Sequence, residues 1–281
     1  MALIGQMNTL QVLRKVDFGV YLDGTVHGDI LLPNREITKN TELDEEDWVN
    51  AFVYRDSEDK LIATMHKPKV QVGQFASLKV VDINRVGLFL DWGLSKDLLL
   101  PHSEEKRPLQ VGDYCMVYVY LDPHTERITA SARLDRHLKD TATNEELPKG
   151  MQVDLLVAER TDLGFKAIIN GKYWGLIHKN ELFRFVRPGM QIEGYVRLVR
   201  DDGRISLSLQ KQGHEMRDEL GEQILQRLKD NGGSLALSDK SDPQIIANAF
   251  NVSKGNFKKS IGGLFKQGLI IIYDDHIELK A

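Results

Sequence analysis

"RLVRDDGRISLSLQ", residues 197–210, reads as a strand, a tight turn at Asp202-Gly203 and a second strand. In the second strand, apolar residues at 205, 207 and 209 alternate with polar residues at 206, 208 and 210. This alternation is typical of a strand that turns one face to a core and the other to water. Whether such a hairpin stands alone or recurs decides the fold.

The hairpin recurs. The sequence "RISLS" at 204–208 matches "RITAS" at 127–131 and, more weakly, "KLIAT" at 60–64. Gly150, Gly164 and Gly189 are separated by 14 and 25 residues, and so are the glycines at 73, 87 and 112. In the first copy, the glycines at 5 and 19 keep the spacing of 14, and the third glycine is replaced near Glu46. Three copies with one spacing indicate a tandem repeat.

Each copy is predicted to form five short strands. In the third copy these are 151–160, 164–170, 173–178, 190–200 and 204–210, with a short turn or helix over 179–188. The middle glycine is predicted to lie where the second strand coils sharply. Five coiled strands of this length favour an OB-type barrel. The predicted domains are barrels at 1–66, 67–135 and 147–212, with a polar linker over 136–146 that forms a hinge or a short helix.

The remaining segment, 213–281, has helical periodicity. Apolar residues share one face over 214–231, Pro243 starts a second helix, and Ser253 caps a third that Gly268 ends. A hairpin about Asp274-Asp275 follows. Three helices and a hairpin predict a winged helix, so the fold class is mainly β with a C-terminal α+β domain.

Composition narrows the function. The 281 residues carry a formal net charge of −4, so any basic surface is local. The chain has a single cysteine, Cys115, which we expect to be buried and without a chemical role. A chain that cannot form an internal disulfide is typical of a reducing compartment. No signal-peptide pattern and no run of about 18 apolar residues occurs, which predicts a cytoplasmic protein without a membrane partner. We find no metal-ligand, phosphate-loop or nucleophile motif, and expect no enzyme activity, metal or cofactor.

The repeats resemble the S1 RNA-binding domain in their glycine-led strand, in "LLP" or "GLIH", and in "GRISLSL". Three such barrels followed by "NVSKGNFKKSIGGLFKQGLI" resemble the conserved virulence factor B family over the whole chain. The resemblance implies an RNA-binding regulator of gene expression, including virulence genes.

The S1 resemblance also implies a binding face made of aromatic residues near the middle glycine, a histidine that ends strand three, and charged residues near the last hairpin. Carried over, these positions are Phe18 and Tyr21 in the first copy, Phe89 and Arg127 in the second, and Lys166, His178, Arg200 and Arg204 in the third. The match is uneven, since proline replaces the histidine in the first two copies and Lys166 and Arg200 replace an aromatic and an acid.

Charge favours the third copy. Residues 148–212 carry 11 basic and 7 acidic side chains, whereas residues 1–66 carry 6 basic and 12 acidic ones. Phosphate contacts supply much of the affinity for nucleic acids, so we expect single-stranded RNA on the third barrel. We expect Arg200 rather than Arg197 to share a face with Arg204. The alternatives are that Phe18 and Tyr21 are core residues, that His178 is a partly buried histidine, and that the arginines form a solvated face.

The winged helix offers a second nucleic-acid face, made of Asn256, Lys258, Lys259 and Lys266. In helix-turn-helix proteins the equivalent helix reads DNA. The rival functions are therefore a DNA-binding transcription regulator acting through the winged helix, and a protein-interaction scaffold that uses the acidic first barrel.

Overall fold

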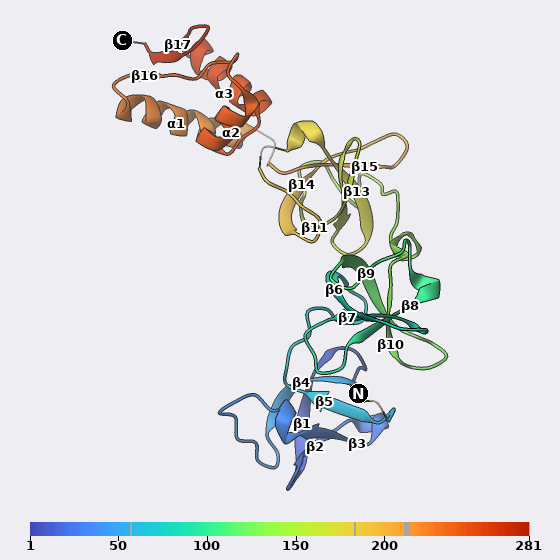
Figure 1. The fold of residues 1–281 in the computed structure, drawn as a ribbon. Coiled ribbons are helices and arrows are strands. Elements are labelled where there is room, and N and C mark those ends of the chain that lie inside the picture. Colours follow the sequence, from blue (N-terminus) through green and yellow to red (C-terminus); the bar gives the residue numbers. More distant parts are fainter. Residues whose placement is uncertain (57, 183, 211–213, 281) are drawn as a thin grey trace. The chain divides into compact units, whose positions relative to one another are not determined.

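The structure, a computed structural model, describes residues 1–56, 58–182, 184–210 and 214–280. It divides into two compact units, residues 1–137 and 138–281. The predicted architecture is confirmed: three closed five-stranded barrels are followed by helices and a small sheet (Figure 1). The boundary predicted between residues 212 and 213 lies outside the described residues. In the described part of the chain, no helix is long and apolar enough to cross a membrane.

The first unit holds two barrels. The strands of the first are β1 (Met7–Val16), β2 (Gly19–Asp23), β3 (Asp29–Pro33), β4 (Trp48–Arg55) and β5 (Leu61–Thr64). Those of the second are β6 (Phe75–Ile83), β7 (Gly87–Asp91), β8 (Leu98–Pro101), β9 (Tyr114–Leu121) and β10 (Ile128–Ser131). In both, the fifth strand lies between the third and the fourth and closes the barrel. Short 3₁₀ turns are η1 (Thr25–His27), η2 (Asn34–Glu36), η3 (His102–Glu104) and η4 (Leu134–Arg136).

The second unit begins with the third barrel. Its strands are β11 (Gln152–Thr161), β12 (Gly164–Ile169), β13 (Tyr173–His178), β14 (Gln191–Val199) and β15 (Ile205–Ser208), with the turn η5 (Lys179–Glu181) after β13. The winged helix has α1 (His214–Asp230), α2 (Pro243–Phe250) and α3 (Lys254–Lys266), with a sheet of β16 (Ser234–Leu235), β17 (Ile270–Ile272) and β18 (Ile277–Leu279). Ser253 caps α3 as predicted, since its Oγ accepts a hydrogen bond from Asn256 N.

The repeated glycines are required by a close backbone approach. Gly19, Gly87 and Gly164 each begin the second strand and pair with the last residue of the third. A Cβ atom on Gly164 would lie 2.0 Å from the carbonyl oxygen of Ile177, which no side chain tolerates. Each barrel also has a register shift between its first and second strands, just after Val12, Val80 and Val157, where an extra residue in the first strand forms a bulge.

The segment predicted as a linker packs on the third barrel. Leu138, Ala142 and Leu147 are buried, and Ala142 N donates a hydrogen bond to Gly203 O. The Tyr173 hydroxyl donates to Glu146 at 2.8 Å. Residues 138–147 are therefore part of the second unit rather than a hinge. In the first unit, Cys115 is buried as expected, and burial raises the pKa of its thiol to about 11.

Candidate nucleic-acid interface

The third barrel brings two predicted residues onto one outer surface. Inward side chains of β12 and β13, such as Ala167 and Ile177, lie in the core, so Lys166 and His178 point outward. Lys166 is paired with Leu176, which is paired in turn with Ser206 of β15. Both predicted side chains are half-buried. We call the surface formed by Lys166 and His178, together with the buried Ser206 beside them, the third-barrel face.

Each side chain of this face has a defined contact. Ser206 Oγ and His178 Nε2 lie 3.4 Å apart. The Lys166 ammonium lies 3.9 Å from the ring centroid of Trp174, a cation–π distance. His178 is therefore the partly buried histidine of the alternative interpretation, yet its ring borders the outer surface of three strands.

Arg200 and Arg204 face each other across the last hairpin. Arg200 N donates to Arg204 O at 2.9 Å, and both guanidinium groups approach Asp202, at 3.7 and 3.9 Å. These long, exposed ion pairs are weak, so both guanidinium groups stay accessible to a ligand. Asp201 adds a second carboxylate, so residues 200–204 hold two arginines and two aspartates. Arg204 lies two residues before Ser206, which places it on the side of the third-barrel face.

Arg197 has a different partner. The register of β14 shifts between Val196 and Leu198, so the bulge falls at Arg197, and its guanidinium lies 3.2 Å from Glu181. Glu181 also accepts a hydrogen bond from Ser208 Oγ at 2.7 Å. The structure thus pairs Arg200 with Arg204 across the hairpin, whereas the Arg197 guanidinium pairs with Glu181.

The first barrel presents aromatic rings to solvent. The Phe18 side chain is 57% exposed and its ring meets that of Tyr21 edge to face at 6.5 Å. The guanidinium carbon of Arg14, which sequence reasoning missed, lies 3.9 Å from the Tyr21 ring centroid. Phe18 and Tyr21 are therefore not core residues, and the alternative that they belong to the barrel core is wrong. Arg14 also pairs with Asp29 at 3.3 Å, which reduces the charge it offers to a phosphate.

The second barrel keeps Phe89 and Arg127 in different environments. Phe89 is half-buried on β7 and is paired with Leu99. Both Arg127 Nε and Nη2 donate to the Asp59 carboxylate, at 2.9 and 2.6 Å, and this bond lowers the pKa of Asp59. The predicted phosphate ligand is therefore occupied by a carboxylate of the first barrel, within the same unit.

On the winged helix, some of the predicted nucleic-acid-binding residues contact other parts of the protein and others do not. Asn256 donates a side-chain hydrogen bond to the Gln210 side chain, and Lys258 pairs with Asp239 at 2.9 Å. Lys259 and Lys266 are exposed, and neither forms an ion pair with a carboxylate in the described part of the chain. Two of the four predicted residues thus make intramolecular contacts and two remain for a ligand.

Metal-binding arrangements are not found within the described ranges: no three His, Cys, Asp or Glu side chains gather there. Sequence reasoning also missed the glutamates at 36, 104 and 181, which end the 3₁₀ turns η2, η3 and η5. Their constant spacing could have identified them, because each glutamate follows the middle glycine of its repeat by 17 residues.

Comparison with known proteins supports this domain organisation. The family model "S1 domain" matches residues 4–66 and 72–132, and the model "CvfB-like winged helix domain" matches residues 222–279. The third barrel lies outside these ranges and is related to the first two by its strand order and glycine spacing.

Curated relatives match nearly the whole chain. An uncharacterized protein YitL of Bacillus subtilis is 33% identical over 95% of this chain and 90% of its own length. Conserved virulence factor B of Staphylococcus haemolyticus is 27% identical over 99% of this chain and 94% of its own. A solved multidomain protein with nucleic acid binding domains from Streptococcus pneumoniae is 25% identical, covers 98% of each chain and has a TM-score of 0.42.

Proposed function

The chain belongs to the conserved virulence factor B family and is a nucleic-acid-binding protein, and we propose that its ligand is single-stranded RNA, held first by the third barrel. The observation that carries the proposal is the surface on which Lys166 and His178 lie, with Arg200 and Arg204 paired at the adjoining hairpin. Cations bind phosphates, and planar rings stack on unpaired bases. The protein would regulate gene expression by occupying the transcript, without catalysing a reaction on it.

The charge distribution gives the same preference. The third barrel is the only one of the three whose sequence is net positive, at +4 for residues 148–212. A negatively charged first barrel repels a polyanion, and a basic surface attracts it over a distance of about a Debye length. RNA should therefore approach and bind the third barrel before it meets the other two.

Support for DNA binding is weaker. A winged helix that reads a duplex needs cations free to reach two backbones, yet Lys258 and Asn256 are engaged within the protein. The domain from residue 213 onward is also net negative, with 9 basic and 10 acidic side chains. Binding of duplex DNA is therefore the alternative to RNA binding, and one experiment can distinguish the two.

That experiment is a salt titration of the full chain with a single-stranded RNA and a duplex DNA of equal length. We expect tighter binding of the RNA at every salt concentration, with log affinity falling linearly against log salt. Tighter binding of the duplex would overturn the proposal and favour a transcription regulator.

A further inference from the structure

The three repeats carry a glutamate at the same place, but only two of these glutamates are fully engaged within their own barrels. Glu104 accepts from Ser131 Oγ at 2.5 Å on one oxygen and pairs with Arg136 at 3.1 Å on the other. Glu181 is held in the same way, by Ser208 at 2.7 Å and Arg197 at 3.2 Å. A fifth-strand serine and an arginine thus satisfy both oxygens.

Glu36 of the first barrel lacks this arrangement, although it is the most buried of the three. Its side chain is 6% exposed, against 16% for both Glu104 and Glu181. Its Oε1 is 3.4 Å from Ser95 Oγ and 3.7 Å from Arg35, and its Oε2 has no hydrogen bond or ion pair with any residue that the structure describes. Among the described residues, Arg55 Nε is the only buried side-chain polar atom without a hydrogen-bond partner, so Glu36 Oε2 is accessible and can accept from a donor in the cavity.

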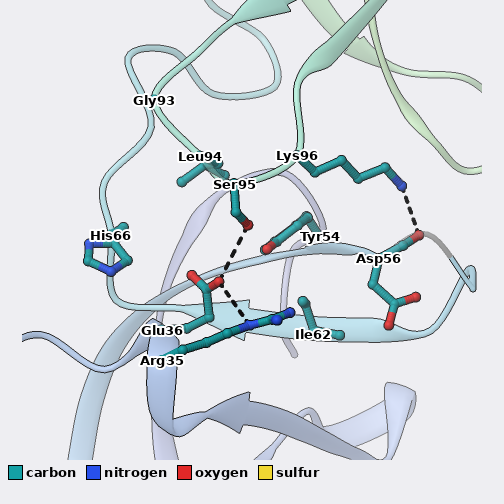
Figure 2. A pocket seen from close by; sticks show the side chains of 10 residues that line it. All are labelled: Arg35, Glu36, Tyr54, Asp56, Ile62, His66, Gly93, Leu94, Ser95 and Lys96. Atoms are coloured by element: carbon teal, nitrogen blue, oxygen red, sulfur yellow. Dashed lines mark hydrogen bonds and ion pairs between the residues drawn. The ribbon is translucent and has the colours of Figure 1, made fainter.

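Glu36 lines a cavity of about 770 Å³ within the first unit (Figure 2). Figure 2 shows the Tyr54 hydroxyl, Ser95 hydroxyl and Glu36 carboxylate directed toward one another, with Arg35 beside them. The remaining lining includes apolar Ile62 and Leu94. This volume suits a nucleotide-sized molecule, since small-ligand pockets span about 300–1,000 Å³.

The cavity is fixed by packing between the first two barrels. Phe52 on β4 meets the buried Trp92 edge to face, with ring centroids 5.5 Å apart. The Trp92 indole donates to Lys96 O, and the Lys96 ammonium donates to the carbonyl oxygens of Arg55 and Asp56 at 3.2 and 2.8 Å. These contacts hold the loop that carries Ser95 and Lys96 against the first barrel, so the cavity is preformed.

The polar groups match the hydrogen-bonding edge of guanine. Guanine presents the O6 acceptor beside two donors, N1–H and the 2-amino group, and the cavity presents two hydroxyl groups beside a carboxylate. Adenine, cytosine and uracil do not offer two adjacent donors to one carboxylate. The exposed Arg35 guanidinium supplies positive charge for a phosphate.

We propose that this cavity binds the guanine base of a nucleotide, with Glu36 as acceptor for N1–H and the 2-amino group and with Arg35 as phosphate ligand. The nucleotide is either free or part of a bound RNA. The RNA form of the proposal rests on the proposed function, whereas the free-nucleotide form does not.

The first test uses the full wild-type chain and calorimetric titration with GMP, IMP and AMP. IMP keeps O6 and N1–H but lacks the 2-amino group. We expect GMP to bind roughly tenfold more tightly than IMP, and AMP to bind more weakly still. A parallel titration compares single-stranded oligouridylate with the same strand carrying one guanosine or one inosine.

The outcomes separate the two sources of the base. Preference for guanine with mononucleotides supports a free nucleotide, and preference with the oligonucleotides alone supports a residue of RNA. Equal binding of guanine and its competitors in both titrations overturns the proposal. If RNA binds without any base preference, the proposed function stands and the cavity assignment fails; if no RNA binds, the proposed function fails and the mononucleotides alone decide the cavity.

The second test compares Glu36→Gln with Glu45→Gln, an exposed acidic residue of the same barrel that gives the same change of charge. We expect Glu36→Gln to lose guanine binding by about tenfold or more and Glu45→Gln to keep it. Unchanged binding in a folded Glu36→Gln protein overturns the proposal. If circular dichroism shows that this variant does not fold, the wild-type comparison of GMP, IMP and AMP decides the question.

Discussion

The first and third barrels share one strand order but present opposite chemistry. The first barrel exposes the aromatic pair Phe18 and Tyr21 on an acidic sequence, whereas the third presents Lys166, Arg200 and Arg204 on a basic one. The fifth strands differ too. Ile62 on β5 packs with the core of the second barrel, but Ser206 on β15 contacts His178. In the first barrel, part of the surface thus serves barrel packing, and in the third the corresponding surface stays polar.

The sharpest way to break this comparison is to separate the two units. We expect residues 138–281 to keep most of the affinity for single-stranded RNA and residues 1–137 to bind about tenfold or more weakly, a difference of ~1.4 kcal/mol or more. The cut follows residue 137 because residues 138–147 pack on the third barrel. Fluorescence anisotropy measures both affinities, and equal binding by the two fragments would contradict the charge account.

The second prediction removes the two hairpin arginines of the third barrel. Arg200→Ala with Arg204→Ala should weaken binding of unrelated RNA sequences and flatten the slope of log affinity against log salt by about 0.7 per lost contact. The matched control is Lys39→Ala with Lys67→Ala, which removes two exposed cations of the first unit. A folded double arginine variant with the wild-type salt slope would show that these arginines are only a solvated face.

The third prediction makes the first unit less acidic, and so more like the third barrel in its charge. Asp59→Asn should remove the negative charge and one of the two acceptor oxygens that hold Arg127, so residues 1–137 should bind RNA more tightly. We expect the salt slope to steepen by up to about 0.7, the value for one added phosphate contact. A salt titration of this fragment that matches wild type would mean that Arg127 does not reach RNA.

The fourth prediction tests the exposed rings. Phe18→Ala in the full chain should change RNA affinity by less than about twofold, although a stacking residue that is used loses ~1–3 kcal/mol per base on substitution by alanine. Equilibrium binding at one salt concentration is sufficient. A loss at the upper end of that range would show that stacking outweighs repulsion in the first barrel.

The smallest expected effect concerns pH. The hydrogen bond from Arg127 lowers the pKa of Asp59 in the folded state, so the pair stabilises the first unit above the ordinary carboxyl pKa. That contribution is lost as the pH falls through the lowered pKa. The difference in melting temperature between wild type and Asp59→Asn should therefore shrink in acid, and a difference that is constant with pH would contradict the assignment.

Much of the fold was predictable because the repeat shows itself as a constant spacing between residues that are close in sequence. Gly87 and Gly164 mark a backbone approach that no side chain tolerates, and their separation from the end of the third strand is constant. The start of α2 at Pro243 and the cap of α3 at Ser253 were equally local. Such features depend on neighbours in the chain, and a sequence displays them directly.

The candidate site was less predictable because its partners are distant in sequence. Arg127 lies 68 residues from Asp59, and Glu36 lies 59 residues from Ser95. Nothing in the spacing of the repeats indicates which glutamate lacks its usual partners. The bulge at Arg197 was likewise hidden, since one shifted pair in the register changes which side chains share a face.

The most direct test of the central claim maps the bound RNA on the intact chain. A single-stranded RNA that carries 4-thiouridine is photo-crosslinked to the protein, and mass spectrometry identifies the attached peptides. We predict that most crosslinks fall in β12, β13 and the hairpin that contains Arg200 and Arg204. Crosslinks concentrated instead on β2, around Phe18 and Tyr21, with none on the third barrel, would contradict the account.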